Sequence, residues 1–123
     1  MKKVLITGAN KSIGYETARQ LLQQGYFVYL GCRDITKGNH AVEELKNEGL
    51  NHVAAVEIDV TSADSVGAAR IEIGKKTNVL DVLINNAGMS GGLPQTALGA
   101  TMDQFKTVYD TNVFGVVRVT QAF

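Results

Sequence analysis

Short apolar runs alternate with longer amphipathic segments along this chain. The runs that begin at Val4 and that cover residues 27–30, 53–58 and 79–84 predict four strands. Between them, apolar positions at helical spacing predict helices that end near residue 24, span residues 35–48, begin at residue 61 or 62, and run from residue 101 onward. This alternation implies an α/β fold, with a parallel sheet and helices on both of its faces.

Turn and cap residues support these helix ends. Gly25 and Gly49 stand where the first two helices should stop, since glycine readily adopts the left-handed conformation that ends a helix. Residues 101–104 (Thr-Met-Asp-Gln) have the spacing of a capping box and should open the last helix. The third helix is the least regular, because Gly67 and Gly74 fall within it or near its end.

The two central strands should end in polar, glycine-containing corners. A doubly wound parallel sheet of the Rossmann type has the strand order 3-2-1-4 here, which places strands 1 and 4 side by side. The corner from Gly8 to Gly14 follows strand 1 and the corner from Asn85 to Gly88 follows strand 4, so both should open on one crevice. The helix after the first corner presents free N–H groups, which suit a diphosphate.

Composition narrows the classes of protein. The chain has 123 residues and a formal net charge of zero, which gives no support for binding nucleic acid or an anionic membrane. No apolar run approaches the ~20 residues that span a bilayer. The chain has a single cysteine, Cys32, which fits a reducing compartment. A strand is expected almost at the N-terminus, with no signal peptide before it. Both observations predict a cytoplasmic protein. His40 and His52 are expected at the surface, and no cluster has the spacing of a metal site.

Taken together, the motifs resemble the short-chain dehydrogenase/reductase family. They are Thr7-Gly8-x-x-x-Ser12-Ile13-Gly14, Asp59-Val60, Asn85-Asn86-Ala87-Gly88 and an asparagine, Asn112, in the following helix. The detailed wording of the first motif, with Cys32-Arg33-Asp34, is most similar to the carbonyl-reductase-like branch. The resemblance covers the whole chain and matches the N-terminal half of a family member. We therefore expect residues 1–123 to be the N-terminal part of a single dinucleotide-binding domain.

The resemblance implies a set of cofactor-binding positions. The glycine corner would hold the pyrophosphate, Asp59 would meet the adenine amino group, Val60 would pack on the adenine ring, and the corner after strand 4 would line the cofactor. The implied residues are Gly8, Asn10, Lys11, Ser12, Ile13, Gly14, Arg33, Asp59, Val60, Asn86, Ala87 and Gly88. Asn85 is expected to be structural.

Three of these assignments have alternatives. The family usually has glycine where this chain has Ser12, whose side chain would either crowd the pyrophosphate or donate a hydrogen bond to a phosphate. Asp59 would alternatively be a residue that merely precedes a helix start. Residues 85–88 would alternatively form a simple turn.

Charge near the end of strand 2 bears on the choice of cofactor. An NAD-type site places a carboxylate there to accept hydrogen bonds from the ribose. The family resemblance puts that acid at Cys32, which is neutral, while Arg33 follows it and Lys11 lies in the glycine corner. A guanidinium and an ammonium suit a 2′-phosphate, so we predict NADP(H) rather than NAD(H). In the alternative, Arg33 and Lys11 are solvated surface charges and Asp34 is the ribose acid.

Asn112 falls on the apolar stripe of the last helix. The stripe consists of Phe105, Val108, Tyr109, Val116 and Val119, and is expected to be buried. A buried amide should be hydrogen-bonded, because an unpartnered one costs a few kcal/mol. One interpretation is a structural tie to strand 4 or a nearby loop. The family resemblance instead implies the asparagine of a catalytic tetrad, which positions a water in a proton relay.

The family's other catalytic groups, a serine and a Tyr-x-x-x-Lys pair, do not occur at matching positions in this sequence. Tyr109, for example, is not followed by lysine four residues later. Without strands 5 and 6, strand 4 should be an exposed edge and the last helix half uncovered. The resemblance implies an NADP(H)-dependent oxidoreductase acting on a small carbonyl or secondary alcohol. It also allows homo-oligomers that pair through the helix beginning at Thr101.

Two rival functions stay open at this point. One is a catalytically silent module that senses NADP(H) or serves as a scaffold for partner proteins. The other is a different Rossmann-type enzyme that uses the same fold for another nucleotide, since fold does not dictate function.

Overall fold

The fold is described from a computed structural model, which describes residues 1–90 and 96–123. Four parallel strands form one sheet in the order β3-β2-β1-β4, which confirms the predicted order. The strands are β1 (Lys3–Ile6), β2 (Phe27–Cys32), β3 (Val53–Glu57) and β4 (Val82–Ile84). Ile6 pairs with Leu30 on one side and with Ile84 on the other, so these three strands end at the same edge of the sheet.

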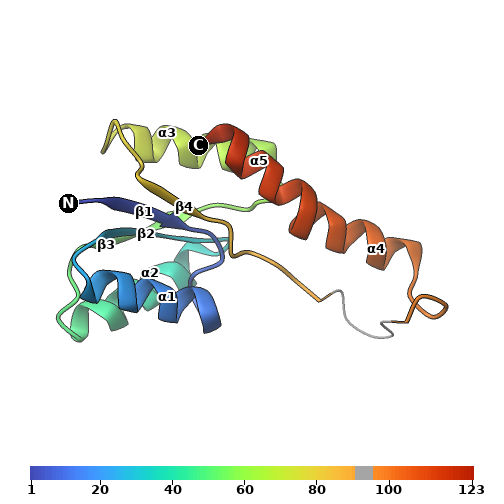
Figure 1. Cartoon of the computed structure of the whole chain (residues 1–123), viewed down its shortest axis with the longest axis horizontal. Helices are drawn as coiled ribbons and strands as arrows, with labels where there is room; N and C mark the ends of the chain where they lie inside the picture. Colours follow the sequence, from blue (N-terminus) through green and yellow to red (C-terminus); the bar gives the residue numbers. More distant parts are fainter. Residues whose placement is uncertain (91–95) are drawn as a thin grey trace.

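Helices cover both faces of the sheet (Figure 1). On one face lie α1 (Ser12–Gln23) and α2 (Ile35–Asn47), and on the other lie α3 (Ala63–Gly74) and α5 (Gly115–Ala122). Two further segments, α4 (Met102–Tyr109) and the π-helical turn η1 (Asp110–Phe114), join α5 without a break and extend away from the sheet. The arrangement is the doubly wound α/β fold predicted from the alternation of strands and helices.

Alternating residues of the strands fill two separate cores. On β1, Val4 and Ile6 pack with the side of α1 and α2, whereas Leu5 between them packs with the side of α3 and α5. On β2, Tyr29 likewise faces the second core while its neighbours face the first. Because both faces of the sheet are covered, the buried positions of β1 from Val4 to Ile6 are apolar without a break, as in most parallel strands.

The predicted helix ends are largely confirmed. Gly25 and Gly49 both have positive φ angles, +91° and +86°, and follow the ends of α1 and α2. Ser62 caps α3, and its hydroxyl accepts a hydrogen bond from the Ser65 backbone N–H. Thr101 and Gln104 form the predicted capping box at the start of α4. Each of these residues satisfies a backbone group that the helix itself leaves unpaired.

The ends of three strands differ from the prediction. Strand β4 begins at Val82 rather than at Val79, because the Thr77 hydroxyl both donates to the Val79 carbonyl and accepts from the Val79 N–H, which makes a turn there. Strand β2 continues to Cys32, paired with β3, and β3 stops at Glu57. The predicted loop around Pro94 lies outside the described residues.

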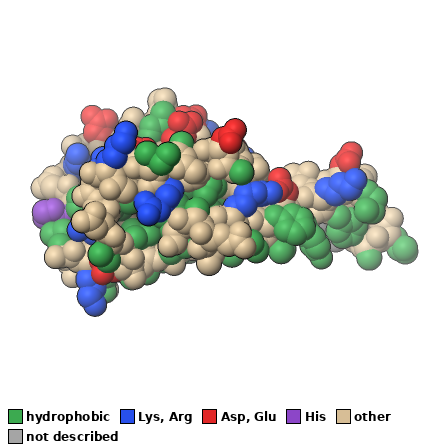
Figure 2. All heavy atoms as spheres, turned by 90° about the horizontal axis from the view of Figure 1, so that it is seen from above, with side chains coloured by type: hydrophobic (Ala, Val, Ile, Leu, Met, Phe, Trp, Pro, Cys, Tyr) green, Lys and Arg blue, Asp and Glu red, His purple; other side chains and the backbone are tan. Residues whose placement is uncertain are grey.

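The stripe predicted to be buried on the last helix is wrong for its first half. Phe105 and Tyr109 are 44% and 56% exposed, while Val119 is fully buried. The physical reason is that α4 and η1 extend beyond the sheet, and only α5 packs against α3 and the sheet. Figure 2 shows hydrophobic side chains gathered on this narrow extension. Val82 is 37% exposed on β4, which is the edge strand of the described sheet, as expected.

Candidate functional site

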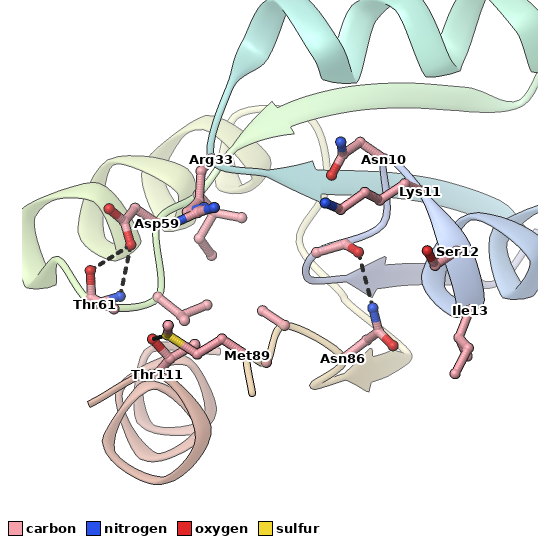
Figure 3. Close-up of a pocket in the computed structure, with 15 residues that line it drawn as sticks. Asn10, Lys11, Ser12, Ile13, Arg33, Asp59, Thr61, Asn86, Met89 and Thr111 are labelled. Atoms are coloured by element: carbon pink, nitrogen blue, oxygen red, sulfur yellow. Dashed lines mark hydrogen bonds between the residues drawn. The ribbon is translucent and has the colours of Figure 1, made fainter. Parts of the chain in front are cut away.

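A cavity of about 380 Å³ opens where the strands end (Figure 3). The turn after β1, the end of β2, the loop after β3, the corner after β4 and η1 all contribute to its walls. Its lining residues are Gly8, Asn10, Lys11, Ser12, Ile13, Arg33, Ile58, Asp59, Val60, Thr61, Asn86, Ala87, Gly88, Met89 and Thr111. The volume falls in the range of about 300–1,000 Å³ that small-molecule and cofactor sites occupy.

Hydrogen bonds join the two corners that the sequence predicted to share one crevice. The buried Thr7 hydroxyl accepts from the backbone N–H groups of Asn86 and Ala87, both at 3.0 Å. The Asn86 side-chain amide donates back to the carbonyls of Thr7 and Gly8, at 3.1 and 3.0 Å. Residues nearly eighty positions apart are thus held together by four hydrogen bonds. Asn85 turns away and donates to the Thr120 hydroxyl of α5, the structural role expected of it.

The two glycines of the first corner have different roles. Gly8 lines the cavity with φ +61°, and a Cβ placed on it would lie 2.9 Å from the Ala87 Cα. Gly14 was predicted to contact the cofactor, but it is buried and does not line the cavity. A Cβ on Gly14 would meet the Asn86 amide and lie 2.8 Å from the Gly8 carbonyl oxygen. Gly14 therefore lets α1 approach the corner closely.

Ser12 is the one non-glycine residue with a positive φ in the described part of the chain, at +56°. This position is where the family usually has glycine, so the backbone keeps a conformation that a side chain disfavours. Ser12 begins α1, and Lys11 before it makes no side-chain capping hydrogen bond. The backbone N–H groups in the first turn of α1 lie beside the cavity. Because the Lys11 side chain does not cap them, they are suited to binding an anion.

Two basic residues lie on one side of the cavity. Figure 3 shows Lys11 and Arg33 there, across the cavity from Met89 and Thr111. Over residues 1–90 and 96–123, no carboxylate lies within 4.0 Å of the charged nitrogens of either residue. Both are exposed, so their charges are available to an anionic ligand.

Asp34, the alternative ribose ligand, has another role in the structure. Its carboxylate caps α2 by accepting from the backbone N–H groups of Thr36 (2.9 Å) and Lys37 (3.4 Å). Asp34 does not line the cavity. Cys32 beside it is buried, and burial, followed by the Asp34 charge, raises the pKa of its thiol. The thiol is therefore neutral, so the last residue of β2, where an NAD-type site has a carboxylate, carries no negative charge.

Asp59 and Val60 both line the cavity, at the start of the loop after β3. The Asp59 carboxylate accepts hydrogen bonds from the Thr61 hydroxyl (2.7 Å) and the Thr61 backbone N–H (3.0 Å). Bonding to the Thr61 hydroxyl, above all, lowers the pKa of Asp59, and the charges of Arg33 and Arg118 act in the same direction. One oxygen of the Asp59 carboxylate thus orders the loop before α3, which is the role that the alternative interpretation gave to this residue. Asp59 nevertheless lines the cavity.

Asn112 lies in η1 next to the cavity but does not line it. Its amide makes two hydrogen bonds with the backbone of Met89: the oxygen accepts from the N–H and the nitrogen donates to the carbonyl, each at 2.9 Å. Contrary to the prediction, the side chain is exposed, because η1 lies beyond the edge of the sheet. The predicted structural tie to a neighbouring loop is therefore present.

Sequence reasoning missed four lining residues: Ile58, Thr61, Met89 and Thr111. Three of them directly flank the predicted motifs, and the fourth, Thr111, precedes Asn112. Their position next to the predicted motifs is the only feature of the sequence that points to them. That position is not enough to identify them as lining residues, because the local backbone decides which neighbour of a motif faces the cavity.

The fold and the cavity together define a Rossmann-type α/β protein with its binding site at the carboxyl ends of the strands. Comparison with known proteins narrows the class. A family model described as short chain dehydrogenase matches residues 2–123, and the chain belongs to this family. Short-chain dehydrogenase anuI of Penicillium roqueforti is 35% identical over 121 residues, which are 98% of this chain and 47% of that protein. The chain spans less than half of the length of the curated relatives it matches.

Two solved structures illustrate the likeness. A variant of actinorhodin polyketide ketoreductase with NADPH has a TM-score of 0.89 and 30% identity, and the match covers 98% of this chain and 45% of that one. A 3-oxoacyl-[acyl-carrier protein] reductase from Brucella melitensis with bound NAD has a TM-score of 0.86 and 28% identity, and the match covers 98% of this chain and 46% of that one.

In the part of our chain that the structure describes, no helix has both the length and the apolar character needed to cross a bilayer.

Proposed function

We propose that this chain is the N-terminal part of the dinucleotide-binding domain of an NADP(H)-dependent oxidoreductase. The enzyme would transfer hydride between the nicotinamide and a small carbonyl or secondary alcohol. The observation that carries the proposal is the joining of the two corners by Thr7 and Asn86 at the mouth of a cavity with basic residues. The chain's share of its relatives' length supports the proposal that it is one part of such a domain.

The residues present fit the cofactor at its adenosine and pyrophosphate end. The close approach at Gly8, the backbone N–H groups of Ser12 and Ile13 in the first turn of α1, and the side chains of Asn10 and Ser12 would hold the pyrophosphate. Asp59 and Val60 would contact the adenine, and Asn86, Ala87 and Gly88 the ribose beyond it. The bound cofactor would supply the hydride. Asn112, held by Met89, would position a water that relays a proton.

Selectivity for NADP(H) rests on this chain's own charges, since the solved neighbours include both an NADPH and an NAD complex. Lys11 and Arg33 border the cavity with no close carboxylate among the described residues. The acid that would favour NAD is engaged elsewhere, because Asp34 caps α2. A guanidinium fork and an ammonium at this place favour a 2′-phosphate.

Titration of the chain with NADPH and with NADH tests this proposal. We expect NADPH to bind about 10–100-fold more tightly, since hydrogen bonds to charged groups contribute about 1.5–3 kcal/mol. Arg33→Glu should remove most of this preference and leave NADH binding little changed. Lys46→Glu is a matched control, because it makes the same charge change on α2 away from the cavity. Equal or tighter binding of NADH by the unaltered chain would refute the selectivity.

A second candidate is a module that binds NADP(H) without catalysis. None of the four tyrosines in the sequence is followed by lysine four residues later, so the family's Tyr-x-x-x-Lys pair does not occur within residues 1–123. Reading the gene past the codon for Phe123 separates the candidates. A serine followed by Tyr-x-x-x-Lys supports the enzyme, and a continuation without them supports the sensor.

Pairing into homo-oligomers through α4 is a further part of the proposal. Phe105 and Tyr109 of α4, and Val113 of η1, are each more than 40% exposed and belong to the two segments that extend away from the sheet. Exposed apolar patches of this kind often mark interfaces. Analytical ultracentrifugation should then show self-association that Phe105→Glu abolishes, and a monomer at every concentration would refute it.

A further inference from the structure

A single arginine on α5 bridges two segments that border the cavity. One guanidinium nitrogen of Arg118, Nη1, donates to the Val60 carbonyl at 2.9 Å and lies 3.4 Å from the Asp110 carbonyl. The other, Nη2, donates to the Asp110 carboxylate at 2.6 Å. Arg118 is half-buried and does not itself line the cavity. It therefore acts on the cavity through the segments that it joins.

The bridged segments form adjoining walls of the cavity. Val60 lines it from the loop after β3, and Thr111, next to Asp110, lines it from η1. Gly115, which follows η1 in the same helix, lies against the other wall: a Cβ there would lie 2.8 Å from the Val60 Cγ2. The absence of a side chain at Gly115 allows the close approach, and Arg118 fixes it with hydrogen bonds in directions that only its planar fork can satisfy.

The bridge continues to a third wall. Asn112, two residues after Asp110, holds both backbone polar groups of Met89, which lines the cavity after β4. The chain of contacts thus runs from Val60 through Arg118 and Asp110 to Met89. A π-helical turn such as η1 is irregular backbone, so the bonds to its first residue, Asp110, fix how the turn sits against the rest of the protein.

We propose that Arg118 and Asp110 are a positioning pair, which holds the Val60 wall and the η1 wall at a fixed separation for the adenosine half of the dinucleotide. The proposal rests on the proposed function. If the walls are already ordered before the ligand binds, binding does not have to supply the free energy of ordering them. The affinity for the ligand is then higher. Neither residue touches the cofactor site directly, and neither is a catalytic residue.

The chain offers a matched control for a merely structural role. Arg19 of α1 donates two hydrogen bonds to Glu48 at 3.0 Å and pairs with Glu16, so it also joins separate segments by ionic hydrogen bonds. Arg19 does not line the cavity, and among the described residues neither do its hydrogen-bonding, ionic and cation–π partners, Glu48, Glu16 and Tyr15. Arg19→Met and Arg118→Met therefore remove similar bridges, one remote from the cavity and one beside it.

The test is titration of the 123-residue chain with 2′,5′-ADP and with NADPH, at a temperature where circular dichroism shows each variant folded. Arg118→Met should weaken both ligands about 10-fold, the effect of about 1.4 kcal/mol lost from binding, while Arg19→Met should leave both within about twofold, the scatter expected of a substitution remote from the site. Arg118→Lys keeps the positive charge but lacks the planar fork of the guanidinium, so this variant should also lose most of the affinity. It provides the test if Arg118→Met does not fold. Hydrogen exchange at the Met89 amide should accelerate in both Arg118 variants and not in Arg19→Met.

The outcomes separate this proposal from the function on which it rests. If the unaltered chain binds neither NADPH nor NADH, the proposed function is refuted and the positioning role with it. If the unaltered chain binds NADPH but the two Arg118 variants bind it equally well, only the positioning role is refuted. An equal loss of affinity in Arg19→Met also overturns it, because the effect is then one of general stability.

Discussion

Gly14→Ala is the most informative single change to the corner after β1. Gly14 lies in the first turn of α1, where an alanine would ordinarily stabilise the helix by up to about 1 kcal/mol. Here the added Cβ would meet the Asn86 amide and lie 2.8 Å from the Gly8 carbonyl oxygen and 3.0 Å from the Ala9 Cα. Two of these three neighbours are backbone atoms, which cannot rotate away.

The cost can be worked from these contacts. The Asn86 amide that would have to move donates to the carbonyls of Thr7 and Gly8, and each such bond contributes about 0.5–1.5 kcal/mol. Overpacking against the backbone of Gly8 adds about 1–3 kcal/mol. Against a helix-propensity gain of about 1 kcal/mol at most, steric crowding should win. We expect a net loss of about 1–5 kcal/mol in the free energy of unfolding, a large part of the 5–15 kcal/mol typical of a domain.

Urea unfolding followed by far-ultraviolet circular dichroism measures this loss, and Gly67→Ala is its control. Gly67 lies inside α3, and no atom would come within 4 Å of a Cβ placed there. The same substitution should therefore stabilise the chain at this site by about 0.5–1 kcal/mol. With a denaturant slope of about 1–3 kcal/mol/M, the midpoint should rise by about 0.2–1 M in Gly67→Ala and fall by about 0.3 M or more in Gly14→Ala.

A Gly14→Ala variant as stable as the unaltered chain would contradict the crowding described at this corner. That result would mean that the corner and α1 are not in the close contact described, and the joining of the two corners through Asn86 would be in question as well. A destabilisation of equal size in Gly67→Ala would point to a general effect of replacing glycine.

Three further changes test other parts of the site. Ser12→Gly should be more stable to urea than Ser12→Ala by about 1 kcal/mol, because only glycine accepts φ +56° without strain; equal stability of the two would contradict a left-handed residue there. Asp34→Ala should lower the free energy of unfolding by about 1 kcal/mol through loss of the cap on α2, with NADPH affinity unchanged; a loss of binding would restore Asp34 as a ribose ligand. The raised pKa of Cys32 means that the folded chain keeps this proton above pH ~8.5, where the unfolded thiol ionises. Stability should therefore fall as the pH rises through that range, and Cys32→Ala should lack this part of the slope when both are unfolded at pH 7.5 and 9.5.

Features that depend on local chemistry could be predicted from the sequence. The left-handed glycines Gly25 and Gly49, the cap at Ser62 and the capping box at Thr101 all follow from which residues satisfy the free groups of a helix end. Strand order followed from the alternation of elements, since right-handed crossovers leave few arrangements of a parallel sheet. The joining of the two corners then followed, because adjacent parallel strands end together.

Roles that depend on side-chain contacts across the fold could not be predicted. Gly14 was assigned to the cofactor because the motif groups it with Gly8, yet its neighbours are Asn86 and the backbone of the corner. The position of Asp34 just after β2 makes it a candidate ribose ligand, but its carboxylate accepts from the N–H groups at the start of α2. In both cases the sequence places the residue near the site correctly, but competition between a ligand and a protein partner decides its role.

Two features of the last helix do not follow from its periodicity: the exposure of α4, which extends beyond the sheet, and the π-helical turn η1. Periodicity assigned Phe105, Tyr109 and Val119 to one face by assuming a uniform helix, whereas η1 inserts a wider turn between the first two and the third. Residues on either side of such a turn do not keep the same phase. The turn stands where Gly115 meets Val60 and where Arg118 bonds to Asp110 and to the Val60 carbonyl, and the contacts with Val60 join segments far apart in the sequence. The irregular turn that presents Asn112 is thus coupled to the loop after β3, and no pattern within the helix itself carries that information.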